Sequence, residues 1–559
     1  MDDDYKASKE AFVSGMTGSS IGHINMVSFA SLLSIALYSA VRTRLPPLSF
    51  MAETCLLVLP MLLSVTVFAN SPALLSLLLA VPTLLLLMLP RRESGTFLPS
   101  VLRHSRASSR TSNTSRDPSP SAALAVPIPP LPALTTYRAH MLLLTFICIL
   151  AVDFPVFPRQ LAKCETFGVS LMDIGVGSFV FSQGIVSAIP LVKNPTHLTA
   201  PLLPKLSLTL RKCSPVLLLG LLRTMSVKGT EYPEHVTEYG LHWNFFVTLG
   251  LIPILQVLLH PVMVYIPISL LGVVVAISHQ LALSMGNLAQ YILDAPRDGV
   301  IAANKEGIIS LTGYLAIHLL GLSTGTLLLA PSPSYFRRRQ QQLAQRNGAA
   351  SIRQRPSTSD SDTDDEVPAV LSDGASTHSA QSPRLEVRRE NDKTATELCS
   401  YAVLWWVFLG ALKLFAVGGD VSRRMANLQY VVWIAAYNST FLLGYLVLDL
   451  AFFPSPLSTS VYSPMSKLKV HLDPDVLKAT RHTAGREWEA AGSAPPLLEA
   501  VNKNGLVLFL LANVATGLIN LSMQTMYMSD WAALLVLTAY SFGLSAVGWA
   551  CRHRKVWRF

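Results

Sequence analysis

The stretch AVDFPVFPRQLAKCETFGVSLMDIGVGSFVF, Ala151 to Phe181, ends one apolar run and opens the next. Asp153 stands where the first run stops, and the prolines at 155 and 158 prevent a helix from continuing there. A second apolar run starts near Ser170. Two apolar runs joined by a short polar turn predict two membrane-spanning helices.

The rest of the chain repeats this pattern. It is 51% hydrophobic and only 14% charged over 559 residues, with a mean hydropathy of +0.42. A soluble chain of this length would need more polar surface than this composition supplies. We therefore expect an all-α polytopic membrane protein with about 13 transmembrane helices. The apolar runs lie near residues 26–41, 54–69, 72–90, 139–154, 170–190, 213–224, 244–260, 262–285, 307–330, 399–417, 428–452, 505–523 and 530–551.

Charge predicts the orientation of these helices. The tail Cys551–Phe559 carries four cations and no acid, so we expect a cytosolic C-terminus. An odd number of spans then places the N-terminus and the Asp153–Asp173 segment on the opposite side. The acidic start, Met1-Asp2-Asp3-Asp4, does not resemble a cleaved signal peptide.

Three polar inserts divide the membrane portion. Segments 91–138 and 331–398 are rich in Ser, Arg, Pro or Gln and are predicted to be disordered cytosolic loops, open to phosphoregulation. Segment 453–504 is predicted to be a cytosolic loop with a short amphipathic helix near 473–490. The remaining units are an N-terminal segment (1–25), helices 1–3 (26–90), helices 4–9 (139–330), helices 10–11 (399–452), and helices 12–13 with the basic tail (505–559).

Carboxylates at a membrane boundary are costly unless they are paired or hydrated, so Asp153 and Asp173 are candidate functional residues. The alternative is that Asp153 pairs with Arg159 or Lys163 only to fix the loop. The glycines at 175 and 177 line the next helix, either at a site or to let another helix pack closely.

Three further segments are predicted to reach the same face. The first holds His235, Glu238, His242 and Asn244. On one helix, the first three would share a face, as in a metal site, an acid–base pair or a polar substrate contact. The alternative is that they only cap the helix at the membrane interface. The second contains Asn304. The third contains Arg423, Arg424 and Asn427, whose guanidinium groups could bind an anionic substrate group or anchor lipid headgroups.

The sequence contains no motif for several other kinds of function. The six cysteines are scattered without metal-like spacing, so we expect no metal site. There is no Walker motif, no GxSxG elbow and no basic-aromatic repeat, so ATP-driven transport, α/β-hydrolase chemistry and nucleic-acid binding are not expected. No feature specifies an oligomeric state.

Several stretches together resemble the GPI inositol acyltransferase family, known in fungi as GPI-anchored wall transfer proteins. The similarity lies in Tyr5–Val13 with Thr17–Ser20, Tyr137–His140, the block Asp153–Phe181, His235–Phe246, Asn304–Tyr314 and Ser422–Trp433. The Asp153–Phe181 block is the most specific of these. The disordered inserts are not covered.

This resemblance implies a multi-pass protein of the endoplasmic reticulum membrane with a lumenal active site. It implies transfer of a fatty acyl group, typically palmitoyl, from acyl-CoA to the inositol of glucosaminyl-phosphatidylinositol, with acyl-CoA as co-substrate and no further cofactor. In the family, the acid and lysine that match Asp153 and Lys163 are regarded as catalytic. The family often has a second basic residue after Arg159, where this chain has Gln160.

The resulting hypothesis makes Asp153 the base for the inositol hydroxyl and Lys163 the group that stabilises the oxyanion. His235 or His242 is the reserve base. Arg159, Asp173, Asn244, Asn304, Arg423, Arg424 and Asn427 are the remaining candidate substrate-binding residues. The alternatives are a lipid flippase or secondary transporter, for which we see no internal repeat, and an acyltransferase with another acceptor.

Overall fold

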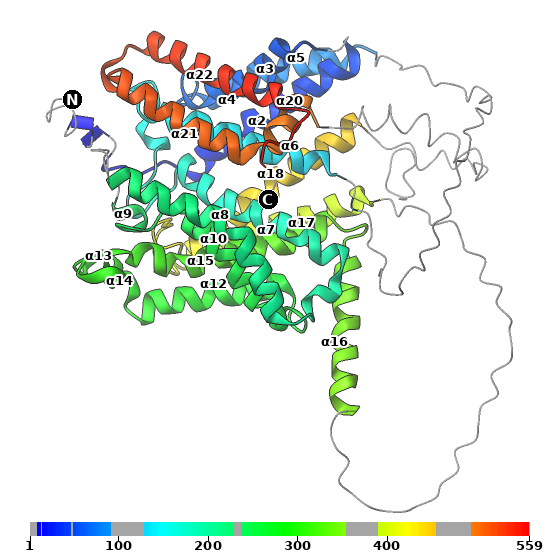
Figure 1. Ribbon diagram of the computed structural model, residues 1–559. Helices are drawn as coiled ribbons and strands as arrows, with labels where there is room; N and C mark the ends of the chain where they lie inside the picture. The colour runs from blue at the N-terminus through cyan, green and yellow to red at the C-terminus, as the bar shows by residue number, and fades with distance from the viewer. Residues whose placement is uncertain are drawn as a thin grey trace, which may run out of the picture.

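The computed structural model describes residues 8, 9, 11, 12, 14–45, 48–90, 128, 130–228, 236–353, 389–453 and 494–557. Within these ranges the named secondary-structure elements are all helical, and one isolated antiparallel bridge joins Ser19 to Val169. Figure 1 shows the helices packed side by side in one bundle.

Nine helices in the described ranges are long and apolar enough to cross a membrane. They are α2 (Ile21–Arg44), α6 (Pro132–Ala151), α7 (Leu171–Lys193), α12 (Ile268–Met285), α15 (Lys305–Leu328), α17 (Asn391–Leu414), α18 (Leu428–Phe452), α21 (Gly505–Ser522) and α22 (Asp530–Ala550). Shorter apolar helices are α3 (Phe50–Leu57) with α4 (Leu59–Val65), α5 (Pro72–Leu87) and α10 (Phe245–Leu258).

The remaining helices are shorter, more polar or both. They are η1 (Arg159–Leu161), η2 (Pro195–Leu198), α8 (Leu202–Lys228), α9 (Val236–Tyr239), α11 (His260–Met263), α13 (Leu288–Asp294), α14 (Gly299–Ala303), α16 (Tyr335–Arg353), α20 (Pro496–Lys503) and η3 (Thr525–Tyr527). All the apolar runs predicted from the sequence fall on helices, which confirms the all-α polytopic class. The total of about 13 spans stays a prediction, because α8 and the shorter apolar helices do not meet the length and composition of the other nine.

The prediction that residues 331–398 are disordered was wrong for part of that segment. Helix α16 occupies Tyr335–Arg353, and α17 begins at Asn391. Gln, Arg and Ala are good helix formers, and the start of α16 is held by contacts: Phe336 is buried, and Gln340 donates to the carbonyl of Ile266. Helix α6 likewise begins at Pro132, before the predicted end of the first insert. The amphipathic helix expected near 473–490 lies outside the described residues.

The polar segments meet at one end of the bundle, as predicted. Main-chain hydrogen bonds join the N-terminal segment to the loop after α6 (Ser19 to Val169) and that loop to the segment before α18 (Gly168 to Val421). A third joins the segment before α10 to that before α15 (Leu241 to Ala303). In Figure 1, α9, α13 and α14 lie at one end, whereas α16 extends from the other.

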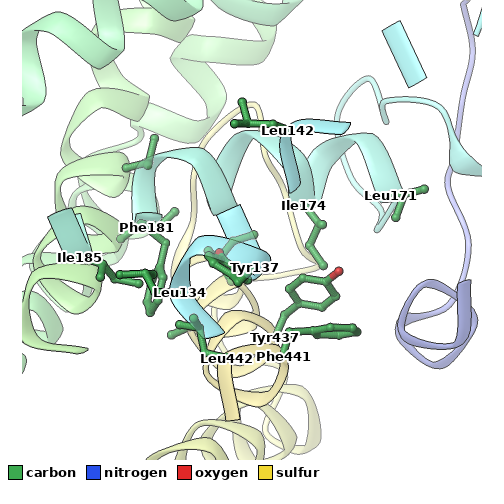
Figure 2. Packing of buried hydrophobic residues seen from close by; sticks show 14 of the residues in the cluster. Leu134, Tyr137, Leu142, Leu171, Ile174, Phe181, Ile185, Tyr437, Phe441 and Leu442 are labelled. Carbon is green, nitrogen blue, oxygen red and sulfur yellow. The ribbon is translucent and has the colours of Figure 1, made fainter. Parts of the chain in front are cut away.

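Small residues bring α7 and α15 close together. A Cβ on Gly184 would collide with the carbonyl oxygen of His318, one on Gly321 with that of Phe181, and one on Gly325 with that of Ile185. Close packing of this kind is a main source of helix association inside a membrane. Figure 2 shows the adjoining apolar cluster, in which α6, α7 and α18 contribute Tyr137, Phe181 and Leu442, among others.

We predict that Gly321→Ala destabilises the protein by about 1–3 kcal/mol, because the new methyl group forces α7 and α15 apart. Gly410→Ala on α17 is the matched control, since a Cβ there meets nothing within 4 Å. Thermal unfolding of the two detergent-purified variants measures the difference. Equal midpoints would contradict the packing assigned to Gly321.

Candidate active site

A cavity of about 1070 Å³ lies between helices that include α6, α7, α18 and α21. Helix α6 lines it with one face, from Tyr137 to Val152, over a length of roughly 22 Å. One part of the wall is apolar and includes Leu144, Ile149 and Phe441. The other part carries charged and amide side chains, which include Lys9, Asp153, Lys163, Glu238, Asn244, Arg423 and Asn520. The cavity therefore combines an apolar part, which we call the chamber, with a polar, charged region.

Asp153 enters this cavity from the loop that ends α6. It lies two residues beyond the last helical residue, Ala151, and only 5% of it is exposed. Its Oδ2 accepts a hydrogen bond from Asn520 Nδ2 at 2.8 Å. Its Oδ1 lies 3.5 Å from Lys9 Nζ. In the described chain, no ion pair joins Asp153 to Arg159 or Lys163, so neither alternative pairing is present.

Lys163 belongs to a second charged group. Its Nζ donates to Glu238 Oε1 at 2.8 Å, and Arg423 lies 3.3 Å from the same oxygen. Burial alone would raise the pKa of Glu238, but the cations of Lys163 and Arg423 outweigh it and hold that pKa at about 2. The side chain of Lys163 remains 40% exposed and lines the cavity. It is thus oriented by Glu238 yet still open to a ligand.

Asp173 anchors this second group at the start of α7. Its Oδ1 accepts from Arg423 Nε at 2.6 Å, and its Oδ2 accepts from the main chain of Cys164 and from Ser170 Oγ. Ser170 in turn accepts from the Asp173 main chain, which caps the helix. Burial would lower the pKa of Arg423, but Glu238 and Asp173 raise it well above the usual value. Asp173 holds the network together and does not line the cavity.

Comparison with known proteins shows similarity to one family along nearly the whole chain. The family GWT1 matches residues 5–551. The chain is 36% identical to GPI-anchored wall transfer protein 1 of Cryptococcus neoformans var. neoformans serotype D, over 99% of both chains. It is 35% identical to the protein of that name from Aspergillus fumigatus, over 100% of this chain and 99% of the other. It is 32% identical to that of Yarrowia lipolytica, over 97% and 96%.

The chain belongs to the GWT1 family. Membership at this level of identity, over nearly the full length of each protein, supports a role in GPI-anchor biosynthesis. It also agrees with the resemblance drawn from the Asp153–Phe181 block.

Other predicted residues of this GWT1-family protein support the walls of the site. Arg159 donates to the carbonyls of Val152, Phe154 and Phe157 and stacks on Phe12, so it closes the loop after α6 and does not line the cavity. Burial lowers its pKa to about 10. Its predicted contact with substrate stays a prediction.

Of the three asparagines predicted from the sequence, Asn244 alone lines the cavity, where it caps α10 and donates to the carbonyl of Gly220. Asn304 accepts from the His242 main chain, and Asn427 caps α18. Arg424 pairs with buried Glu306 at 2.8 Å. These three residues position neighbouring segments, and their predicted roles in substrate binding stay predictions.

The helix face expected to join His235, Glu238 and His242 does not form. Helix α9 ends at Tyr239, and Gly240 follows with a φ of 113°. A Cβ at Gly240 would collide with the main chain of Ala303 and Asn304, so glycine is required for this turn. The turn separates His242, which is exposed, from Glu238. His235 lies outside the described residues.

Sequence reasoning did not select Lys9 or Asn520, although both line the cavity, and it named Glu238 only as part of a helix face with the two histidines. Signals for Lys9 and Asn520 were present. Lys9 belongs to the N-terminal stretch that carries the family resemblance, and Asn520 is an amide within an apolar run. A polar side chain inside a membrane span is a candidate functional residue.

The ion pairs of Glu238 predict a pH dependence of stability. Its pKa is about 2 in the folded protein against an ordinary value of 4.5. Its stabilising contribution is therefore complete above about pH 4.5 and is lost as the pH falls toward 2. We expect the difference in unfolding midpoint between wild type and Glu238→Gln to shrink over this window. A difference that stays constant down to pH 2 would contradict the assigned pairing.

Proposed function

We propose that this protein is an inositol acyltransferase of GPI-anchor biosynthesis. It transfers a fatty acyl group, typically palmitoyl, from acyl-CoA to an inositol hydroxyl of glucosaminyl-phosphatidylinositol. The observation that carries the proposal is the single cavity in which Asp153 and Lys163 border an apolar chamber. Family membership supports the pathway, and the chamber supports a long-chain acyl donor.

The chamber matches an acyl chain in chemistry and in length. The wall along α6 extends over roughly 22 Å, and burying each methylene of a chain contributes about 0.8 kcal/mol. The charged region at the other part of the cavity suits the polar parts of both substrates. Lys163 and Arg423 supply positive charge there, which favours the anionic phosphates of acyl-CoA and of the glycolipid.

In the proposed reaction, Asp153 accepts the proton of the inositol hydroxyl as the hydroxyl oxygen attacks the thioester carbonyl carbon. The new C–O bond forms, the C–S bond breaks, and the CoA sulfur leaves with the electron pair and takes up a proton. Lys163 stabilises the negative charge that develops on the carbonyl oxygen. Glu238 orients this ammonium at 2.8 Å. The reaction needs no cofactor besides acyl-CoA as co-substrate.

We further propose that the protein acts in the endoplasmic reticulum membrane, with this cavity on the lumenal side and the C-terminus in the cytosol. The basic tail supports this orientation. Asn504 donates to the carbonyl of Cys551, which places the start of the tail beside α20. The main chain of Leu497 in α20 donates to Glu53, and the hydroxyl of Tyr38 donates to the same carboxylate. Tyr38 lies near the end of α2 that is remote from Ser19, so these contacts support a tail on the side opposite Ser19.

We predict that Asp153→Asn lowers turnover by about 100-fold or more, because the amide cannot accept the hydroxyl proton. The assay follows acylated glucosaminyl-phosphatidylinositol by mass spectrometry in microsomes supplied with palmitoyl-CoA. Asp298→Asn, at an exposed position outside the cavity, is the matched control. Wild-type turnover by Asp153→Asn would overturn the mechanism. Depletion of the protein without accumulation of the non-acylated glycolipid would overturn the proposed function.

We also predict that Gly175→Leu shifts the enzyme toward shorter acyl donors. Gly175 lines the cavity, and a Cβ there meets nothing within 4 Å, so the added side chain fills the chamber without disturbing the fold. We expect the preference for palmitoyl-CoA over octanoyl-CoA to fall by about tenfold or more. An unchanged preference in a folded variant would place the acyl chain elsewhere.

A further inference from the structure

Residues from the N-terminal segment and from α21 meet at Asp153. Lys9 comes from the segment before α2. Asn520 comes from α21 and is 367 residues away from Asp153 in the sequence. The side chains of Lys9 and Asp153 are only 10% and 7% exposed. All three residues line the cavity. An ammonium and an amide are thus buried against the carboxylate that the proposed function uses as its base.

The amide of Asn520 is held in one orientation. Its Oδ1 accepts from Lys9 Nζ at 3.0 Å and from Thr525 Oγ1 at 3.1 Å. Both partners donate to this atom, so the Nδ2 of the same amide is left to donate to Asp153 Oδ2. Thr525 is itself fully buried. The chain of contacts Thr525–Asn520–Asp153 therefore fixes one oxygen of the carboxylate.

Lys9 is the cation that faces the other oxygen, at 3.5 Å. The remaining charged groups nearby are engaged elsewhere. Arg159, which interacts electrostatically with Asp153, donates to three main-chain carbonyls. Lys163 pairs with Glu238. Glu165, which also lines the cavity, accepts from the Gly15 main chain. Helix α21 brings only the neutral amide of Asn520 to Asp153.

The N-terminal segment is fixed by contacts of its own. The main-chain N–H of Gly15 donates to Glu165 Oε1 at 2.8 Å, and that of Ser19 donates to the carbonyl of Val169. Phe12 lies under the guanidinium of Arg159. These contacts attach the segment to the loop that carries Asp153 and Lys163. They hold the segment where Lys9 reaches the cavity.

We propose that Lys9 and Asn520 are positioning residues for Asp153, and that the segment preceding α2 is therefore part of the active site. Asn520 fixes Oδ2, which leaves Oδ1 to accept the substrate proton. Lys9 places a positive charge 3.5 Å from Oδ1 and holds the carboxylate from that side. The inference rests on the proposed function and divides the cations: Lys9 serves the base, and Lys163 serves the developing oxyanion.

The test compares Lys9→Met, Lys9→Arg and Asn520→Leu in microsomes with palmitoyl-CoA and glucosaminyl-phosphatidylinositol. The Lys393→Met variant is the matched control, since Lys393 forms an exposed pair with Glu390 outside the cavity. The measurements are kcat, KM and the pH dependence of kcat/KM. We expect both Lys9→Met and Asn520→Leu to lower kcat by about 10- to 100-fold with little change in KM.

The pH profile separates positioning from a general loss of structure. In Lys9→Met the acidic limb of kcat/KM should move to higher pH by about 1 unit or more, because the carboxylate has lost its cation. Lys9→Arg keeps the charge and should restore the wild-type limb. Asn520→Leu should lower kcat even where Lys9→Met fails to fold, which keeps the proposal testable through either residue.

The outcomes distinguish the positioning roles of Lys9 and Asn520 from the proposed function. Wild-type kcat and an unmoved acidic limb in a folded Lys9→Met, or wild-type kcat in Asn520→Leu, would overturn the positioning roles while the proposed function stands. Absence of acylated glycolipid with the wild-type protein itself would overturn the proposed function. Loss of activity in Lys9→Met that Lys9→Arg does not restore would also count against the role of the charge.

Discussion

The structure depends on neutralising charge at the edge of a membrane. Arg423 is almost fully buried, and it is stable there because Asp173 and Glu238 both contact it. A buried cation without such partners would cost several kcal/mol. Its two ion pairs join the start of α7, helix α9 and the segment before α18, and Glu238 then orients Lys163. The same ion pairs that allow these segments to approach one another thus also shape the charged part of the cavity.

Much of the fold could be predicted from the sequence, because a membrane span is a local property. A run such as 428–452 needs only its own apolar residues to be recognised, and α18 has the same bounds. The wrong predictions also came from judging each segment by its own composition. Helix α16 was judged by its polar composition, although its anchoring contacts from Phe336 and Gln340 depend on residues far along the chain. Helix α17 begins at Asn391, before the apolar run predicted at 399–417. Its first turns are polar, so the apolar pattern did not include them.

The site could be predicted only in part, for a related reason. The Asp153–Phe181 block placed Asp153 and Lys163 in one short loop, and both line the cavity. Proximity in sequence suggested that they pair with each other, but in the fold each pairs with a residue from another segment. Lys163 and Glu238 are 75 positions apart, and Asn520 is farther still from Asp153. Such partners follow from helix packing, which a single sequence does not specify.

Separate partners for the two groups have a chemical consequence. A direct ion pair between Lys163 and Asp153 would join the proposed base to the proposed oxyanion stabiliser, so that the two could not act on different atoms of the substrates. With Lys9 and Asn520 at the carboxylate and Glu238 at the ammonium, the two groups line one cavity with separate partners. A general base and an electrostatic stabiliser require opposite charges at the same time. In the proposed mechanism, the fold serves this requirement by bringing the partners of these two groups from the N-terminal segment, α9 and α21.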